Sequence, residues 1–152
     1  MQDIRDRIKQ IAKEAEPELI SIRRELHQYP ELGINLPKTH EIISRELKKI
    51  PNLKVREHMA GGYGIIAELQ GKKAQGKNIL LRADIDALPL EEQVDCDYKS
   101  THPGKMHACG HDGHATWLIG AAKILARLTG ESEDVSGSHF SREKRSDLEQ
   151  IR

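Results

Sequence analysis

The stretch MHACGHDGHATW, residues 106–117, brings together side chains that bind metal ions. Cys109 and His111 stand two positions apart, and residues at this spacing point to the same side of an extended chain. A thiolate and an imidazole placed in this way can bind one divalent cation. The pair suits zinc, while manganese, cobalt and nickel remain open. Gly110 between them lets the backbone bend, so the sequence predicts a loop or strand end here.

A helix is expected to begin just after the pair, near Asp112 or Gly113. Its positive dipole end would favour a thiolate on Cys109 and a carboxylate on Asp112, which helps a metal site form at neutral pH. His107 and His114 lie close enough in sequence to be ligands, outer hydrogen-bond donors or substrate contacts. Spacing alone leaves these three roles open for both histidines.

A second stretch that can carry chemistry is LLRADIDALP, residues 80–89, in which an apolar run ends in two acids. Alternation along a strand places Asp84 and Asp86 on one side. One carboxylate can then orient a metal-bound histidine while the other caps the following turn. The alternative is that both carboxylates only cap a turn.

The elements that would position these residues follow from the apolar periodicity. Helices are expected over 4–26, with Pro17 marking a kink or the start of a second helix, and after Pro37 up to Ile50. Strands are expected in LKVREH, GYGIIAEL and NILLRADI. A last helix is predicted after the metal motif, with one apolar face formed by Trp117, Ala121, Ile124 and Leu128. This order predicts an α/β fold with a mixed sheet flanked by helices.

Composition excludes some classes of partner and location. Lys plus Arg and Asp plus Glu both number 24, so the net charge gives no reason to bind nucleic acid or an anionic membrane. No apolar run is long enough to span a membrane and the N-terminus lacks a secretory pattern, so we expect a cytoplasmic protein. Cys96 has no histidine at a ligand spacing and is expected to be a small buried or half-buried residue. His27 is expected to cap the end of the first helix.

Three separated stretches match one family pattern. They are RRELHQYPELGINLPKT (23–39), GYGIIAELQG with ILLRADIDALPLEE (62–92), and MHACGHDGHATWLIGAAKIL (106–125). In their order and spacing they resemble the amidohydrolase branch of the M20 metallopeptidase family, which includes hippurate hydrolases, N-acyl-amino-acid amidohydrolases and auxin-conjugate hydrolases. The resemblance covers residues 1–128, and the charged segment 129–152 is expected to be a disordered or weakly helical tail.

This resemblance implies a zinc-exopeptidase-like catalytic domain with two divalent ions per site, zinc or manganese, and a smaller inserted domain used for dimerisation. It also implies hydrolysis of the amide bond of small-molecule N-acyl amino acids. Cys109 and His111 would be metal ligands, and Asp84 a supporting carboxylate of the site.

The sequence departs from the family pattern after the last expected helix. In the family a pair of glutamates, which supplies the general base and a third ligand, follows that helix, and two further histidine ligands come later. Segment 129–152 shows no such motif. We therefore expect an incomplete, N-terminal portion of the enzyme that lacks the dimerisation domain and is inactive alone. The alternative is a non-catalytic module that binds metal through Cys109 and His111. An incomplete sheet would also expose a strand edge.

Overall fold

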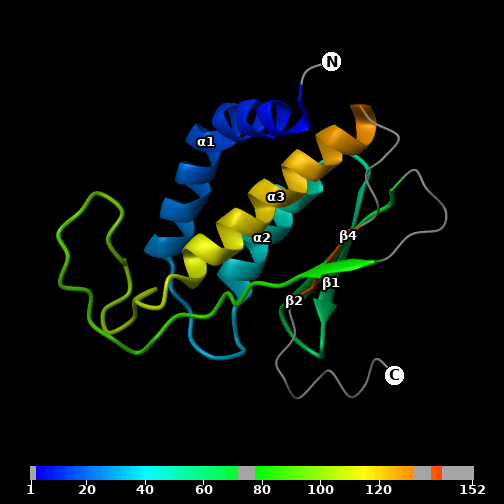
Figure 1. Ribbon diagram of the computed structural model, residues 1–152. Coiled ribbons are helices and arrows are strands. Elements are labelled where there is room, and N and C mark those ends of the chain that lie inside the picture. Colours follow the sequence, from blue (N-terminus) through cyan, green and yellow to red (C-terminus); the bar gives the residue numbers. More distant parts are fainter. Residues whose placement is uncertain (1–2, 72–77, 132–137, 142–152) are drawn as a thin grey trace.

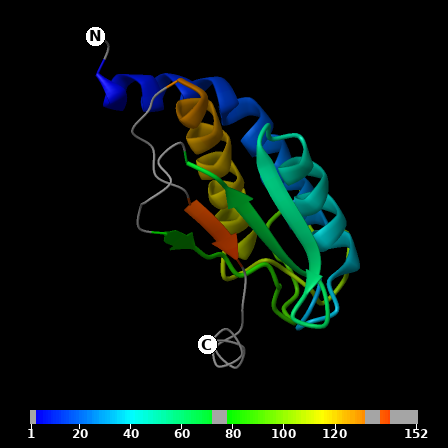
Figure 2. The same ribbon diagram turned by 90° about the vertical axis from the view of Figure 1, so that its right-hand side faces the viewer.

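The computed structural model describes residues 3–71, 78–131 and 138–141 and consists of one sheet with helices packed against it. Its elements are α1 (Ile4–Gln28), α2 (Pro37–Lys48), β1 (Leu53–Met59), β2 (Gly64–Leu69), β3 (Ile79–Leu81), α3 (His111–Glu131) and β4 (Ser138–Ser141). The three helices lie on one face of the sheet (Figures 1 and 2). The expected order of two helices, three strands, a loop and a helix is confirmed.

The sheet has the strand order β1-β2-β4-β3. The pairs β1–β2 and β2–β4 are antiparallel, whereas β3 and β4 are parallel. The sheet is therefore mixed, and the α/β class predicted from the sequence is confirmed. In β2 the residues facing the helices, Ile65, Ala67 and Leu69, are buried and alternate with half-buried ones, as expected for a sheet covered on one face.

Strand β4 differs from the sequence expectation for the segment after residue 128. Residues 129–131 continue α3, and Ser138–Ser141 pairs with both β2 and β3. For these four residues the expectation of disorder or weak helix is wrong. The physical reason is that β2 and β3 both present unpaired backbone groups, which a strand between them can satisfy. The rest of the expected tail, 132–137 and 142–152, lies outside the described residues.

Helix α1 passes through Pro17 without breaking into two helices. It bends along its course (Figures 1 and 2), which agrees with the kink predicted from the missing proline amide. Helix α2 begins at Pro37, and its first amides are capped by Glu31, whose carboxylate accepts from the backbone nitrogens of Lys38 and Thr39 at 3.2 and 2.7 Å. No helix of the described chain has the length and apolar character to cross a membrane.

Helix α3 packs on α1 and the sheet through a face that differs from the predicted one. Ala115, Ile119, Ala122 and Ala126 are buried together with Leu128, whereas Trp117 is 71% exposed. The prediction that Trp117 belongs to the buried face of α3 is therefore wrong. The reason is that small residues let α3 approach α1 closely: a Cβ at Gly120 would lie 2.9 Å from a methyl group of Leu19.

Candidate metal centre and its supporting network

The segment between β3 and α3, residues 82–110, carries most of the predicted site residues, and we call it the site loop. It leaves the sheet, protrudes beyond the helices and returns to the start of α3 (Figure 1). Ala87 donates to the carbonyl oxygen of Glu31 at 2.7 Å, and Leu88 and Met106 form an antiparallel bridge at the base of the loop. These bonds bring the Asp84–Asp86 end of the loop next to the Cys109–His111 end.

The turn at Cys109–His111 has the form that the sequence predicted, but the helix begins one residue earlier than expected. Gly110 has a φ of +76°, a left-handed conformation that favours glycine. Its carbonyl accepts from the amide of His114 at 3.0 Å and so begins the hydrogen bonds of α3, which starts at His111 instead of Asp112 or Gly113. Cys109 is exposed, and the side chain of His111 is 17% exposed.

His111 is oriented by Asp86, not by Asp84. Its Nδ1 lies 2.8 Å from the carbonyl oxygen of Asp86 and 3.2 Å from its Oδ1. An imidazole that donates from Nδ1 keeps a lone pair on Nε2, which has no hydrogen-bond partner among the described residues. This is the arrangement of a metal-binding histidine whose second nitrogen is held by a carbonyl or carboxylate.

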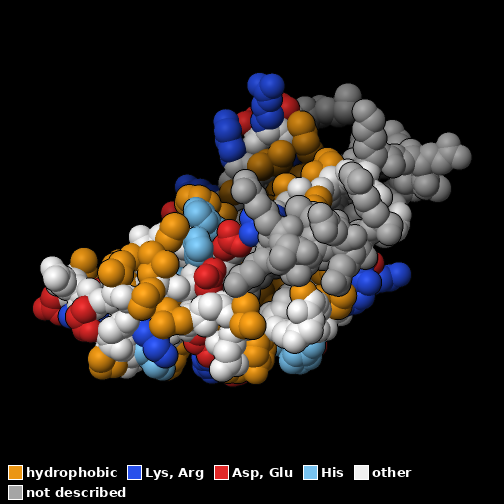
Figure 3. Space-filling view, turned by 90° about the horizontal axis from the view of Figure 1, so that it is seen from below, with side chains coloured by type: hydrophobic (Ala, Val, Ile, Leu, Met, Phe, Trp, Pro, Cys, Tyr) orange, Lys and Arg blue, Asp and Glu red, His pale blue; other side chains and the backbone are white. Residues whose placement is uncertain are grey.

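Asp84, the supporting carboxylate expected from the family resemblance, lies in a different contact. Its Oδ1 accepts from Arg82 at 2.5 Å, and its side chain is 36% exposed. Histidine and acidic side chains lie close together on the surface beside the protruding site loop (Figure 3). That loop also exposes Leu88, Leu90 and Val94.

The donor set fits a divalent cation in part. An exposed thiol and an imidazole with an available Nε2 are two of the ligand types that zinc and related ions prefer. Within residues 3–71, 78–131 and 138–141, however, no three His, Cys, Asp or Glu side chains are grouped so that they could hold an ion. The metal-ligand role of Cys109 and His111 therefore stays a prediction, and a complete site would need ligands from other groups.

A buried charged network lies directly behind this turn, centred on His27. The imidazole is 4% exposed; its Nδ1 is 2.7 Å from Oδ2 of Asp112 and its Nε2 is 3.0 Å from Oε1 of Glu92. Asp112 also accepts from Nε of Arg23 at 2.8 Å, and Glu92 accepts from the amide of Ser100 at 2.6 Å. Helix α1, the site loop and α3 therefore meet through these side chains.

The network sets the charge of its members. The hydrogen bond with Asp112 raises the pKa of His27 above its ordinary value; burial opposes this effect, and Glu92 adds to it. Burial alone would raise the pKa of Asp112, but the bond from His27 and the charge of Arg23 outweigh burial and hold that pKa below its usual range. Glu92 behaves likewise: its burial is outweighed by the Ser100 amide and His27, so its pKa is lowered. Two buried carboxylates therefore enclose the His27 ring and favour its protonated form.

The two histidines whose roles the sequence left open lie in different surroundings. His107 is buried, neither ring nitrogen has a hydrogen-bond partner among the residues that the structure describes, and burial lowers its pKa to about 4. His114 is exposed, with its ring 5.8 Å from that of His111 and 5.7 Å from that of Trp117. His107 thus lies inside the supporting network, whereas His114 lies on the open side of α3.

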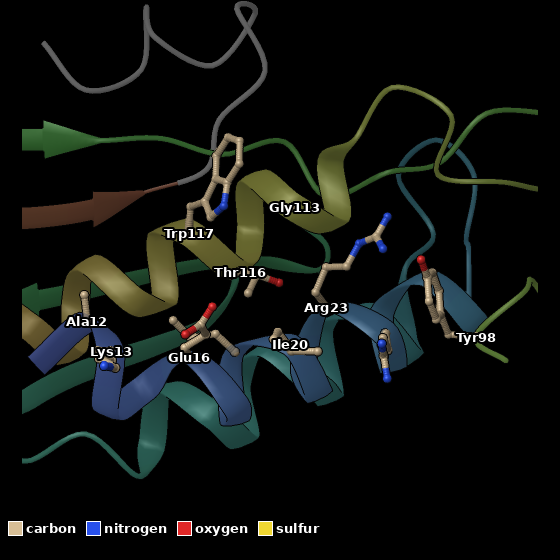
Figure 4. Close-up of a pocket in the computed structure, with 11 residues that line it drawn as sticks. Ala12, Lys13, Glu16, Ile20, Arg23, Tyr98, Gly113, Thr116 and Trp117 are labelled. Atoms are coloured by element: carbon tan, nitrogen blue, oxygen red, sulfur yellow. The ribbon is translucent and has the colours of Figure 1, made fainter. Parts of the chain in front are cut away.

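A groove of about 600 Å³ runs between α1 and α3 on the outer side of the network (Figure 4). Arg23 extends from α1 beside Tyr98 at one end of it, with its guanidinium 5.1 Å from the ring centre. Trp117 and Gly113 line it from α3. The groove therefore borders Arg23 and the first turn of α3, while Cys109 and His111 are not among its lining residues.

Sequence reasoning missed the centre of this network. His27 was expected to cap the end of α1, but its ring nitrogens face side chains 65 and 85 positions away along the chain. Glu92 was not singled out at all. The one available signal was that both residues lie within the family-matching stretches. Cys96 is half-buried, as the sequence predicted for a small buried or half-buried residue.

Comparisons with known proteins show what this chain is similar to. The family described as peptidase family M20/M25/M40 matches residues 80–139. Thermostable carboxypeptidase 1 of Saccharolobus solfataricus is 38% identical, over 82% of this chain and 31% of its own length. The N-acyl-L-amino acid amidohydrolase of Geobacillus stearothermophilus is 35% identical, over 88% and 34% respectively. N-acetyl-L-cysteine deacetylase of Bacillus subtilis is 47% identical, over 72% and 26%.

The fold has a solved counterpart. The Bacillus subtilis YXEP protein, described as a dinuclear metal-binding peptidase of the M20 family, superimposes with a TM-score of 0.78 at 35% identity. The match covers 88% of this chain and 36% of that protein. The chain spans between about a quarter and a third of the length of the curated relatives it matches.

Proposed function

The chain belongs to the M20 family of metallopeptidases, of which it matches an N-terminal portion, and from this membership we propose that its Cys109 and His111 are ligands of a hydrolytic metal centre. The proposed reaction is hydrolysis of the amide bond of small N-acyl amino acids, because two of the relatives are named for that activity. The observation that carries the proposal is the pair of contacts from Nδ1 of His111 to Asp86, which leave Nε2 free for an ion.

Each residue has a stated part in this proposal. Cys109 contributes a thiolate, and the left-handed Gly110 holds it in the turn before His111. Asp86 fixes the ring orientation and tautomer of His111 and makes Nε2 a better donor. Asp84 is proposed to support the site at longer range, through its pairing with Arg82 at the end of β3. When bound, divalent ions supply an acidified water and polarise the scissile carbonyl.

The general base and the further ligands are assigned to none of the described residues. We propose that the chain by itself does not hydrolyse N-acyl amino acids, because a catalytic zinc normally has three protein ligands. Zinc or manganese is the proposed metal, with cobalt and nickel as alternatives; two ions and dimerisation through a further domain apply to the complete enzyme. The cytoplasmic location expected from the sequence remains a prediction.

Metal binding is tested on the chain as it stands. Cobalt(II) is titrated into the purified protein, and the charge-transfer absorption that a cobalt–thiolate bond produces is followed. Cys109→Ser is expected to abolish this band. Cys96→Ser is the matched control, because it removes the other cysteine, which is half-buried on the site loop. A band that survives Cys109→Ser would refute the assignment of this thiolate.

Activity is tested in a chimera of this chain with the C-terminal part of the Geobacillus amidohydrolase. Release of amino acid from N-acetyl and N-benzoyl amino acids is measured with ninhydrin, with and without chelator. We expect chelator-sensitive activity that Cys109→Ser and His111→Ala lower by more than about 100-fold, since the loss of outer partners alone costs about 10- to 100-fold. A well-folded chimera without activity would contradict the proposed reaction. One tightly retained equivalent of metal in the isolated chain would instead support a non-catalytic metal module.

A further inference from the structure

The end of α1 carries a buried histidine with two acidic partners, and nothing in the proposed chemistry uses it. We propose that His27 is a positioning residue for the candidate metal centre: as an imidazolium between Asp112 and Glu92, it ties the first turn of α3 and the site loop to α1. This inference rests on the proposed function, because the turn that it positions is the one bearing Cys109 and His111.

The charge of His27 follows from its contacts. Both ring nitrogens face carboxylate oxygens, Nδ1 at 2.7 Å and Nε2 at 3.0 Å, and a carboxylate can only accept. A neutral ring donates from one nitrogen and would leave its other lone pair against an anion. The doubly protonated ring satisfies both carboxylates, and with an exposed fraction of 4% it has little water to replace either of them.

The two carboxylates are anchored on the two arms that flank the metal motif. Asp112 directly follows His111 and lies in the first turn of α3, where it also accepts from Arg23. Glu92 lies on the outgoing arm of the site loop and is fixed by the amide of Ser100. The side chain of His27 thus ties both the site loop and the first turn of α3 to α1.

Further bonds from the end of α1 support the loop but do not reach the metal motif. Thr101 donates its amide and its hydroxyl to the carbonyl of Gln28 at 3.0 and 2.7 Å, and the Gln28 amide group donates to the carbonyl of Asp97. These contacts all lie in the middle of the site loop. Within residues 109–112, Asp112 makes the contacts with α1, through His27 and Arg23.

Several charged or titratable groups face His27 from the elements around it. Arg23 lies on α1 with a guanidinium nitrogen 3.5 Å from Nδ1, and Asp112 lies on α3. From the site loop, Glu92 contacts Nε2, while the Tyr98 and His107 rings are centred 5.6 and 6.3 Å away. The loop also carries Lys99, whose charge acts on Glu92. Two anions therefore outnumber the one fixed cation in direct contact, which favours the imidazolium.

The test compares His27→Gln with His40→Gln in the full chain. His40 is the matched control because it is also buried, at 6% exposed, and its Nδ1 donates to the carbonyl oxygen of Tyr63 at 3.0 Å, away from the metal motif. Glu92→Gln is a second variant that keeps the shape of the side chain and removes its charge, so the proposal can be tested even if His27→Gln does not fold.

The first measurement is amide hydrogen exchange on the metal-free chain. The amides of Gly110 and His114, bonded to the carbonyls of His107 and Gly110, report on the turn. We expect both amides to lose protection from exchange in His27→Gln and, to a smaller extent, in Glu92→Gln. The reference is His40→Gln, compared under conditions in which the variants have the same overall free energy of unfolding. Equal protection in the His27 and His40 variants would overturn the proposal, since a merely structural role predicts equality.

The second measurement is cobalt affinity. We expect His27→Gln to bind cobalt about tenfold more weakly, the low end of the effect of outer residues on metal sites, and His40→Gln to bind unchanged. The ratio of wild-type to His27→Gln affinity should fall as the pH rises and the imidazolium is lost; an affinity unaffected by His27→Gln at all pH values would overturn the proposal. If the wild-type chain shows no thiolate–cobalt band, the proposed function fails, while the exchange result still decides the role of His27.

Discussion

Gly110 offers a quantitative test of the turn on which the metal motif depends. Its φ of +76° lies in the left-handed region, where a residue with a Cβ costs about 1–2 kcal/mol. A Cβ added there would meet no atom within 4 Å, so Gly110→Ala adds backbone strain without a clash. We expect the free energy of unfolding to fall by about 1 kcal/mol, because the strain of about 1–2 kcal/mol is only partly offset by the about 0.4–1 kcal/mol gained when alanine restricts the unfolded chain.

Gly113→Ala is the matched control for this prediction. Gly113 lies in α3 at an ordinary helical φ, and a Cβ there also meets nothing within 4 Å. Alanine should therefore stabilise the protein, by up to about 1 kcal/mol from helix propensity. Urea unfolding followed by circular dichroism measures both variants; the single tryptophan is unsuitable as a probe because Trp117 is already 71% exposed. If both substitutions shift stability in the same direction, the left-handed turn at Gly110 is wrong.

Three further predictions concern the network, the packing of α3 and the start of α2. The raised pKa of His27 stabilises the folded protein fully below pH 6.5, the pKa in the unfolded chain, and this stabilisation is lost as the pH rises through the folded-state pKa. The lowered pKa of Asp112 stabilises the folded protein above pH 3.8, and this stabilisation is lost as the pH falls through the folded-state pKa. Urea midpoints should therefore be highest between these two pH values, and a flat profile up to pH 9 would contradict an imidazolium at His27. Ile119→Ala should cost about 2–5 kcal/mol and Trp117→Ala less than about 0.5 kcal/mol, since their exposed fractions are 2% and 71%; equal losses in thermal unfolding would restore the predicted helix face. Glu31→Ala should cost about 0.5–2 kcal/mol through the lost cap of α2, measured by urea unfolding, and no change would show that the cap is not needed.

The predictable part of the site was local in sequence. Cys109, Gly110 and His111 could be assigned to one turn because three neighbouring residue types already restrict its backbone and its ligand chemistry. The choice between Asp84 and Asp86 could not be made, since both point to the same side of an extended strand and only the return of the site loop decides which one reaches His111. The structure shows Asp86 in that contact and Asp84 beside Arg82.

In the fold, too, local sequence patterns predicted some features and tertiary contacts decided the others. Periodicity predicted three helices and three strands, because a helix or strand that buries one face has apolar residues at regular intervals in the sequence. The position of β4 could not be read from that pattern: it depends on unpaired backbone groups of β2 and β3, which any short extended segment can satisfy. The buried face of α3 was also misjudged, because small residues packed against α1 carry a weaker apolar signal than Trp117.

By itself, the sequence determined the order of helices and strands and membership of the M20 family, and it predicted which side chains bind a metal. These properties depend on residue types and on short spacings along the chain. The tertiary structure alone decided which carboxylate holds His111, and that His27 pairs with Asp112 and Glu92. Those partners are separated by tens of residues, and the strength of such a pairing depends on its burial, which no local pattern records.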